Sequence, residues 1–256
     1  MSEILSHIES GAVAVLTLNR PEARNALDLP TRKLLAENIA RLEEDDSVRV
    51  IVIRGDKKAF AAGADVSLLA EKTPLQVAAL GLEKYWQPIE RLTKPLIACV
   101  EGVALGAGFE LALMCDFIVA SESAKFGLPE VKLGIMPGSG GTQRLVRVAG
   151  KQNALRLLMT GDAITATRAH ELGIVSDLFP AEELWSRTLE LAGAIAALPR
   201  LALTHIRETV RDGADLPLPS ALALERRLFQ TLFDSHDQKE GMAAFLQKRA
   251  PDFKGR

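Results

Sequence analysis

The sequence predicts an α/β protein in which most strands pair in parallel. Short apolar segments typical of strands alternate with longer segments of helical periodicity, in the order strand, helix, strand, helix, strand, helix, strand. The strand segments are almost continuously apolar, as strands covered on both faces are. After about residue 154 the strand signal fades and helical patterns replace it. These observations favour an α/β core followed by a helical region.

The first half of the chain supplies most of the expected strands. Ala12 to Leu18 is short and rich in Val and Leu, and Asn19-Arg20-Pro21 breaks it. A helix then begins after Asp28, a suitable N-cap, with Pro30 in its first turn. Its apolar residues recur at helical spacing: Leu34, Leu35, Ile39 and Leu42. Further strands are expected over 48–53, 95–100 and 116–120, and an amphipathic helix over 76–92.

The second half of the chain is mainly helical. Only 174–179 is expected as a strand, and helices are expected over 181–197, 200–212, 220–234 and 237–248. The third of these helices is apolar over more than half of its girth, through Leu222, Leu224, Leu228, Phe229, Leu232 and Phe233. A helix that apolar is seldom left in water, so it either packs on the core or forms a subunit contact.

Composition and charge exclude several classes of protein. An apolar content of 48% and a charged content of 25% are ordinary for a soluble globular chain of 256 residues. The net charge of −2 gives no support for nucleic-acid binding, which usually requires a basic face. Cys99 and Cys115 lie in apolar runs, so we expect buried free thiols and a reducing compartment. We see no secretion signal and no membrane-spanning run, and we expect a cytoplasmic protein.

Familiar cofactor and metal motifs fail at specific positions. Leu111 stands where a dinucleotide fingerprint beginning at Gly106 needs its third glycine. Gly150-Lys151 lacks the upstream glycine of a phosphate-binding loop, and Pro137 breaks the nucleophile-elbow pattern around Ser139. The four histidines do not pair at metal-ligand spacing, so we expect no metal.

Two carboxylates, Glu110 and Glu130, are the best candidates for chemistry. Glu110 could be a first-turn glutamate that favours the helix dipole, and Glu130 could be an exposed loop carboxylate. However, Leu-Ala-Leu-Met-Cys follows Glu110, so its helix is expected to be buried, and a buried carboxylate needs a reason. The small-residue turns Gly63-Ala64 and Ala107-Gly108 follow strand-like segments, where open α/β folds bind ligands. This combination suggests acid/base chemistry on a carbonyl compound.

Several motifs of the chain match those of a known family. The chain resembles the crotonase, or enoyl-CoA hydratase/isomerase, superfamily across its whole length. The matching segments are Asn19 to Leu27, Ala59 to Asp65, Gly102 to Glu110, Phe126 to Glu130, Gly138 to Leu145 and Phe245 to Lys254.

The resemblance implies a fold that periodicity alone does not give, since periodicity favours a plain doubly wound sheet. Family members form an α/β fold of the crotonase (ClpP/crotonase-like) type, a spiral of β-β-α units with two roughly perpendicular sheets. Their C-terminal helices build a homotrimer, and trimers usually pair into hexamers. We therefore expect a spiral core over 1–197 and a helical trimerisation region over 198–256.

The resemblance also implies an activity, the addition of water to a 2-enoyl-CoA thioester. Glu110 and Glu130 would hold the water between them, and the family suggests Glu130 as the proton donor to C2. The backbone N–H groups of Ala64 and Ala107 would form the oxyanion hole, although many relatives have glycine where Ala107 stands. No separate cofactor is expected, because CoA is part of the substrate.

By resemblance, the CoA path is lined by residues of three segments and of a neighbouring subunit. From the same chain these are Glu22, Ala23, Arg24, Ala62, Asp65, Val66 and Gly106. Phe245 and Lys248 would come from the neighbour, although Lys248 could equally be a solvated surface lysine. Ser67 stands where some hydratases have a lysine near the CoA phosphates, which puts charge pairing there in doubt.

The sequence leaves several hypotheses about the activity and its substrate. The C-terminal end and the Pro129-Glu130 segment are most similar to bacterial 2,3-dehydroadipyl-CoA hydratases of phenylacetate breakdown. A Δ3,Δ2-enoyl-CoA isomerase needs only one glutamate, so the intact pair argues against that activity. Some relatives bind RNA, which the net charge of −2 disfavours. A catalytically silent scaffold would fail to bind CoA thioesters.

Overall fold

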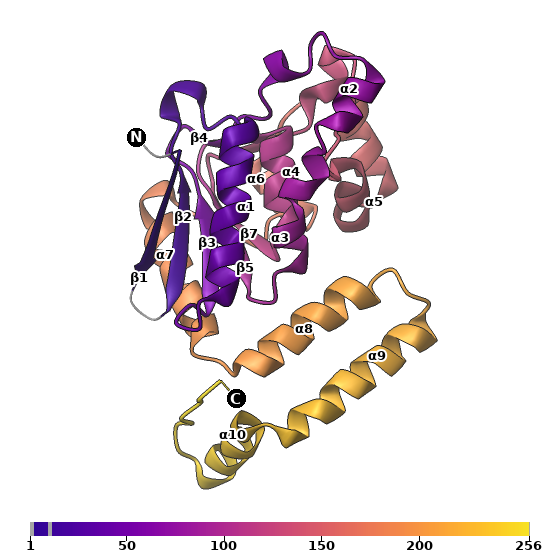
Figure 1. The fold of residues 1–256 in the computed structure, drawn as a ribbon. Helices are drawn as coiled ribbons and strands as arrows, with labels where there is room; N and C mark the ends of the chain where they lie inside the picture. The colour runs from indigo at the N-terminus through magenta and orange to yellow at the C-terminus, as the bar shows by residue number, and fades with distance from the viewer. Residues whose placement is uncertain (1–2, 10–11, 256) are drawn as a thin grey trace.

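The computed structural model describes residues 3–9 and 12–255, which form two β-sheets covered by helices and a C-terminal helical lobe (Figure 1). The larger sheet has six strands in the order β1 (Ile4–Glu9), β2 (Val13–Leu18), β3 (Val50–Arg54), β5 (Leu96–Val100), β7 (Phe117–Ser121), β10 (Asp177–Phe179). The smaller sheet has four, in the order β4 (Ala59–Ala61), β6 (Val103–Leu105), β8 (Lys125–Gly127), β9 (Ile164–Thr165).

Helices connect the strands and form the C-terminal lobe. The α-helices are α1 (Leu29–Glu44), α2 (Pro74–Ala79), α3 (Gln87–Arg91), α4 (Ala107–Met114), α5 (Gly141–Thr160), α6 (Ala166–Glu171), α7 (Ala181–Ala196), α8 (Arg200–Gly213), α9 (Leu218–Thr231) and α10 (His236–Gln247). Short 3-10 helices are η1 (Pro21–Ala23), η2 (Val66–Leu68), η3 (Leu82–Tyr85), η4 (Pro129–Leu133) and η5 (Leu232–Asp234).

The strands are connected as a spiral of β-β-α units. In each successive pair, β3 and β4, β5 and β6, and β7 and β8, the first strand joins the larger sheet and the second joins the smaller sheet. Among the described strands, most pairings are parallel, and β1–β2 and β8–β9 are antiparallel. The α/β spiral implied by the family resemblance is therefore confirmed, and a single doubly wound sheet is wrong.

Both faces of the larger sheet are covered, which explains its continuously apolar strands. Within β3, Val50 and Val52 belong to the apolar cluster formed with α7, while Ile51 and Ile53 belong to the main core on the opposite face. Successive side chains of a strand point to opposite faces, so no position in such a strand can be polar without a buried partner.

The local predictions differ from the structure where elements are short or interrupted. Asp28 does cap α1, because its side chain accepts a hydrogen bond from the backbone N–H of Thr31. The helix expected over 76–92 is instead divided into α2, η3 and α3. Gly81 adopts a left-handed conformation (φ 54°) between the first two segments, and Pro88 lies in the first turn of α3. Strands β1, β4, β6, β8 and β9 were not predicted.

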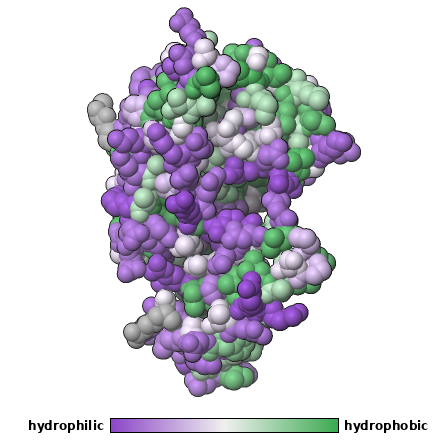
Figure 2. Space-filling view, turned by 45° about the vertical axis from the view of Figure 1, so that its right-hand side comes forward, coloured by the Kyte–Doolittle hydropathy of each residue, from purple (hydrophilic) through white to green (hydrophobic). Residues whose placement is uncertain are grey.

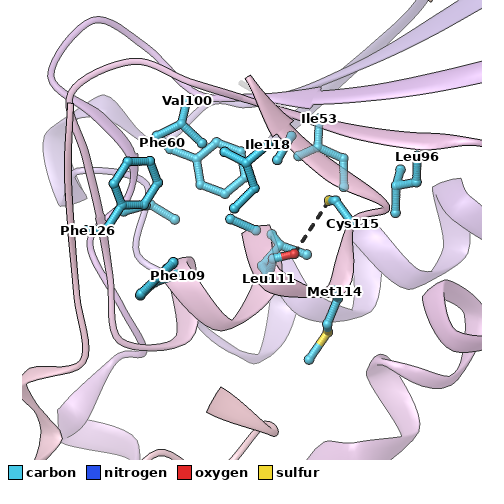
Figure 3. Close-up of a cluster of buried hydrophobic side chains, with 14 of the residues drawn as sticks. Ile53, Phe60, Leu96, Val100, Phe109, Leu111, Met114, Cys115, Ile118 and Phe126 are labelled. Carbon is cyan, nitrogen blue, oxygen red and sulfur yellow. Dashed lines mark hydrogen bonds between the residues drawn. The ribbon is translucent and has the colours of Figure 1, made fainter. Parts of the chain in front are cut away.

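Helix α4 is the centre of the main core. Seven of its residues are buried: Ala107, Gly108, Phe109, Glu110, Leu111, Ala112 and Met114. Figure 3 shows Phe109 and Phe126 close together, with ring centroids 5.3 Å apart, and the thiol of Cys115 directed at the carbonyl of Leu111. Both cysteines are free and buried, as expected. Helix α4 thus carries Glu110 into an apolar interior.

The C-terminal lobe consists of α8, α9 and α10 and lies at the far end of the molecule from β4 (Figure 1). Arg207 of α8 joins it to the core through hydrogen bonds of 2.7 and 2.8 Å to the carboxylate of Asp116. Helix α9 has no buried residue, and its Phe229 is 57% exposed. Figure 2 shows apolar surface on this lobe, beside a hollow that separates the lobe from the rest of the molecule. The division at residue 197 into a core and a trimerisation region remains a prediction.

Among the described residues, no single helix has both the length and the hydropathy to cross a bilayer. Helices α7 and α8 are long and apolar enough only when they are taken together, by length and composition. The two helices are bent by 105° relative to each other.

Candidate active site

Three neighbouring parallel strands bring the candidate residues to one edge of the smaller sheet. Strand β6 pairs in parallel with β4 on one side and with β8 on the other. The segment after β4 carries Ala64, the segment after β6 carries Ala107 and Glu110, and the segment after β8 carries Glu130. Because the carboxyl ends of parallel strands share one edge, residues distant in sequence become neighbours there.

Glu110 is buried in the first turn of α4 and held by a second loop. Its side chain is 2% exposed. Its Oε1 accepts hydrogen bonds from the backbone N–H groups of Ser139, at 2.7 Å, and Gly141, at 2.8 Å. A Cβ atom at Gly141 would lie 3.0 Å from both Cγ and Oε1 of Glu110, so only glycine fits there without displacement. The loop that carries Ser139 and Gly141 therefore fixes one carboxylate oxygen and leaves Oε2 for another partner.

Glu130 lies in η4, directly after β8, and its environment differs from that of Glu110. Burial raises the pKa of Glu130 to about 7, and the nearby charge of Glu110 adds to this shift. Its Oε2 is buried and has no hydrogen-bond partner among the described residues. A Cβ atom at Gly106 would lie 3.1 Å from Oε1 of Glu130, so the glycine allows this carboxyl group to approach the start of α4. A half-buried carboxyl group with such a pKa can donate a proton near neutral pH.

Two backbone N–H groups lie at the same edge. Ala107 is the first residue of α4, where backbone N–H groups have no partner within the helix. Its predecessor Gly106 has φ 51° and ψ −128°, a conformation that glycine adopts readily and other residues rarely do. Ala64 follows β4 and forms an isolated parallel bridge with Leu27. In the described part of the chain, neither N–H donates a hydrogen bond to another backbone group.

Three residues that the sequence analysis did not select as functional form a chain of contacts that leads to Glu110. Ser139 binds Glu110 through its backbone and accepts a hydrogen bond from the indole Nε1 of Trp86 on its side-chain oxygen, at 3.1 Å. The guanidinium carbon of Arg32 lies 5.1 Å from the centroid of the Trp86 ring. Arg32 could have been found as a charged residue three positions before Leu35, on the apolar stripe of α1. Trp86 and Ser139 carried no such signal.

The structure brings some of the expected CoA-binding residues together and not others. The backbone N–H of Ala62 donates to the carbonyl of Arg24 at 3.0 Å, so the segment 22–24 lies beside the segment 62–66. The carboxylate of Asp65 is occupied by the backbone and hydroxyl of Ser67, at 3.0 and 2.7 Å. Phe245 and Lys248 belong to the α10 end of the C-terminal lobe, far from β4 of their own chain (Figure 1).

No group of three or more His, Cys, Asp or Glu side chains within residues 3–9 and 12–255 is arranged to hold a metal ion. The site consists of two carboxyl groups, two backbone donors and the loop that positions Glu110. Such a site can hold a water molecule next to an electron-poor double bond and stabilise negative charge on a carbonyl oxygen.

Comparison with known proteins gives consistent results. A model of the family described as enoyl-CoA hydratase/isomerase matches residues 8–256. The 2,3-dehydroadipyl-CoA hydratase of Escherichia coli (strain K12) is 46% identical over 256 residues, which is 100% of both chains. A probable enoyl-CoA hydratase of Rhizobium meliloti (strain 1021) is 44% identical and covers 96% of each chain. A crystal structure of an enoyl-CoA hydratase subunit from Geobacillus kaustophilus HTA426 has a TM-score of 0.97 at 45% identity, covering 100% of this chain and 99% of that one.

Proposed function

The chain belongs to the enoyl-CoA hydratase/isomerase family and is an enoyl-CoA hydratase, and from this premise we propose how its residues divide the reaction. The observation that carries the proposal is the pair Glu110 and Glu130 beside two free backbone N–H groups at one edge of the smaller sheet. The acyl-CoA substrate supplies the only coenzyme that this chemistry requires.

The first step is attack of water on C3 of the enoyl thioester. Glu110 takes a proton from the water, because its Oε1 is fixed by Ser139 and Gly141 and its Oε2 is available to the water. Glu130 steers the same water through its unpartnered Oε2 and delivers a proton to C2. A pKa of about 7 suits this donor, since a carboxyl group with the ordinary pKa would be ionised at neutral pH.

Addition at C3 moves negative charge to the thioester oxygen. The N–H groups of Ala64 and Ala107 donate to that oxygen, and the positive end of the α4 dipole adds to the stabilisation. Loss of one such donor typically costs about 2.7–4 kcal/mol of transition-state stabilisation. The CoA portion runs along the segments 22–24 and 62–66, where it provides binding free energy remote from the reacting bond.

The natural substrate is 2,3-dehydroadipyl-CoA, a six-carbon enoyl thioester with a carboxylate at its far end. This substrate assignment is supported by the relative from Escherichia coli, which carries this activity in its name and matches the full chain at 46% identity. Turnover measured on crotonyl-CoA, 2-hexenoyl-CoA, 3-hexenoyl-CoA and 2,3-dehydroadipyl-CoA tests it. The highest kcat/KM is expected for the dicarboxylic substrate. A preference for 3-hexenoyl-CoA would instead identify a Δ3,Δ2-enoyl-CoA isomerase.

The active form is a homotrimer or a dimer of trimers, in which Phe245 and Lys248 of one chain complete the CoA site of the next. The support is the exposed apolar surface of the C-terminal lobe, including Phe245, which is 83% exposed in a single chain. An apolar surface of this kind in a single chain is typical of a subunit contact. Light scattering of the purified protein tests this assembly.

A further inference from the structure

Arg32 is a cation on the buried side of α1. Together with Leu35, Ile39 and Leu42 it follows the spacing of the helix face that packs on the core, and all four side chains are buried. Arg32 is only 5% exposed. Arginine is seldom buried to this extent unless a charged or polar partner compensates for the loss of water.

The guanidinium group of Arg32 is only partly satisfied. Its Nε donates to the carbonyl oxygen of Leu27 at 3.0 Å. Its Nη1 is buried and has no hydrogen-bond partner among the described residues. Asp28, one turn earlier on the same chain, is ion-paired with Arg20 at 2.8 Å instead. A buried N–H group without an acceptor is unfavourable, so the site is suited to a ligand that supplies one.

The position of Arg32 links it to both walls of the candidate active site. On one side, its guanidinium carbon lies 5.1 Å from the Trp86 ring centroid, Trp86 binds Ser139, and Ser139 binds Glu110. On the other side, the Leu27 carbonyl that it binds belongs to the residue that bridges to Ala64. Arg32 therefore contacts both walls: it is linked to Glu110 through Trp86 and Ser139, and to Ala64 through Leu27.

We propose that Arg32 binds the carboxylate at the far end of the acyl chain and so selects dicarboxylic enoyl-CoA substrates over unsubstituted ones. The inference deepens the proposed function and rests on it. A carboxylate accepts hydrogen bonds from the planar guanidinium fork, and the Trp86 ring holds that fork in place. An apolar acyl tail would leave Nη1 without an acceptor, so it would bind less well than a carboxylate of equal length.

A second role for Arg32 makes a different prediction. Burial lowers the pKa of Arg32, whereas the charges of Glu110 and Asp28 raise it, so its charge and that of Glu110 interact. If Arg32 served only to balance the charge of Glu110, its removal would impair every substrate to the same degree. If it binds the distal carboxylate, its removal impairs only substrates that carry one.

The test compares two saturated ligands of equal carbon number, adipyl-CoA and hexanoyl-CoA, which differ in the distal carboxylate. Their binding to the full-length protein is measured by calorimetry for the wild type and for Arg32→Leu, which keeps an apolar residue on the buried stripe. We expect Arg32→Leu to weaken adipyl-CoA binding by about 10- to 100-fold, the range of a charge-assisted hydrogen bond, and to leave hexanoyl-CoA within about 3-fold.

Lys33→Leu is the matched control, because Lys33 is the next residue of the same helix and its side chain is 66% exposed. We expect it to leave both affinities within about 2-fold, since exposed charges contribute little. Hydration of 2,3-dehydroadipyl-CoA and 2-hexenoyl-CoA by the same variants should show the same selective loss. Equal losses for both ligands, or none for either, would overturn the assignment of Arg32. A wild type that hydrates neither substrate would refute the proposed function, and the binding comparison would still decide the role of Arg32.

Discussion

At the scale of single residues, the two glutamates are expected to be essential for different reasons. Glu110→Gln and Glu130→Gln should each lower kcat for hydration by about 10²–10⁴-fold, as loss of a general acid or base does. The amide oxygen of a glutamine at 110 can still accept the hydrogen bonds from Ser139 and Gly141, so folding should be preserved. Loss of the absorbance of the conjugated enoyl thioester measures the rate. Near-normal activity in either variant would refute its role.

The raised pKa of Glu130 also predicts how stability depends on pH. Its pKa is about 7 in the folded protein and 4.5 when the group is unperturbed, so between these pH values the folded state binds more protons than the unfolded state. The stability that the protonated carboxyl group of Glu130 contributes is fully present below about pH 4.5 and is lost as the pH rises through about 7. A glutamine at position 130 stays neutral at every pH, so its contribution to stability does not change with pH. The Tm of Glu130→Gln minus that of the wild type should therefore increase from pH 5 to pH 8.

The direction in which this Tm difference changes with pH is the decisive outcome, because the other titrating groups are shared by the two proteins and their effects cancel. Glu130→Asp is a suitable control, since it keeps a carboxyl group and should keep the pH dependence. A Tm difference that is constant or decreases between pH 5 and pH 8 would show that the carboxyl group of Glu130 is solvated in the folded protein.

At the scale of elements, the start of α4 permits a test of one backbone donor. Ala107 is the first residue of the helix, a position that accepts proline, and Ala107→Pro removes the N–H without adding a polar side chain. We expect a loss of at least about 10²-fold in kcat. Ala107→Gly keeps the N–H and should retain most of the activity. If a folded Ala107→Pro protein, shown by unchanged circular dichroism, hydrates at the normal rate, the oxyanion role of Ala107 is wrong.

Elements with strong local signals could be predicted from the sequence, and weak ones could not. Helix α1 was recognisable because Asp28 is an N-cap and Leu35, Ile39 and Leu42 recur at helical spacing. Strands β6 and β8 each have three residues and owe their conformation to pairing with each other, which no local pattern reveals. The sequence also contained the break in 76–92, since Gly81 and Pro88 are breakers, but the apolar periodicity outweighed them in the prediction.

At the scale of the whole molecule, the site depends on contacts between distant segments. Glu110 could be selected from its apolar surroundings, yet its donors lie 29 and 31 residues further along the chain and become neighbours only through the fold. The family resemblance indicated the spiral and the pair of glutamates, because whole motifs carry that information. It did not indicate Arg32, whose importance follows from a buried N–H without a partner.

The assembly gives the last prediction, which concerns α9. Phe229 is 57% exposed in a single chain and packs edge-on against Phe233, with ring centroids 5.1 Å apart. If this face forms the subunit contact, Phe229→Asp places an unpaired charge in an apolar interface and should dissociate the oligomer into monomers. Because Phe245 and Lys248 are proposed to complete the neighbour's CoA site, the monomer should also bind CoA thioesters at least about 10-fold more weakly, as expected when assembly and binding are linked.

Gln230→Asp is the matched control, since it adds the same charge at the next, exposed position of α9. It should leave the molar mass measured by light scattering and the affinity for the thioester unchanged. A Phe229→Asp protein that stays trimeric would place the contact on another surface of the lobe. A fully active monomer, in either variant or in the wild type, would mean that α8, α9 and α10 serve only their own chain, because no residue of a neighbour would then be needed to bind CoA.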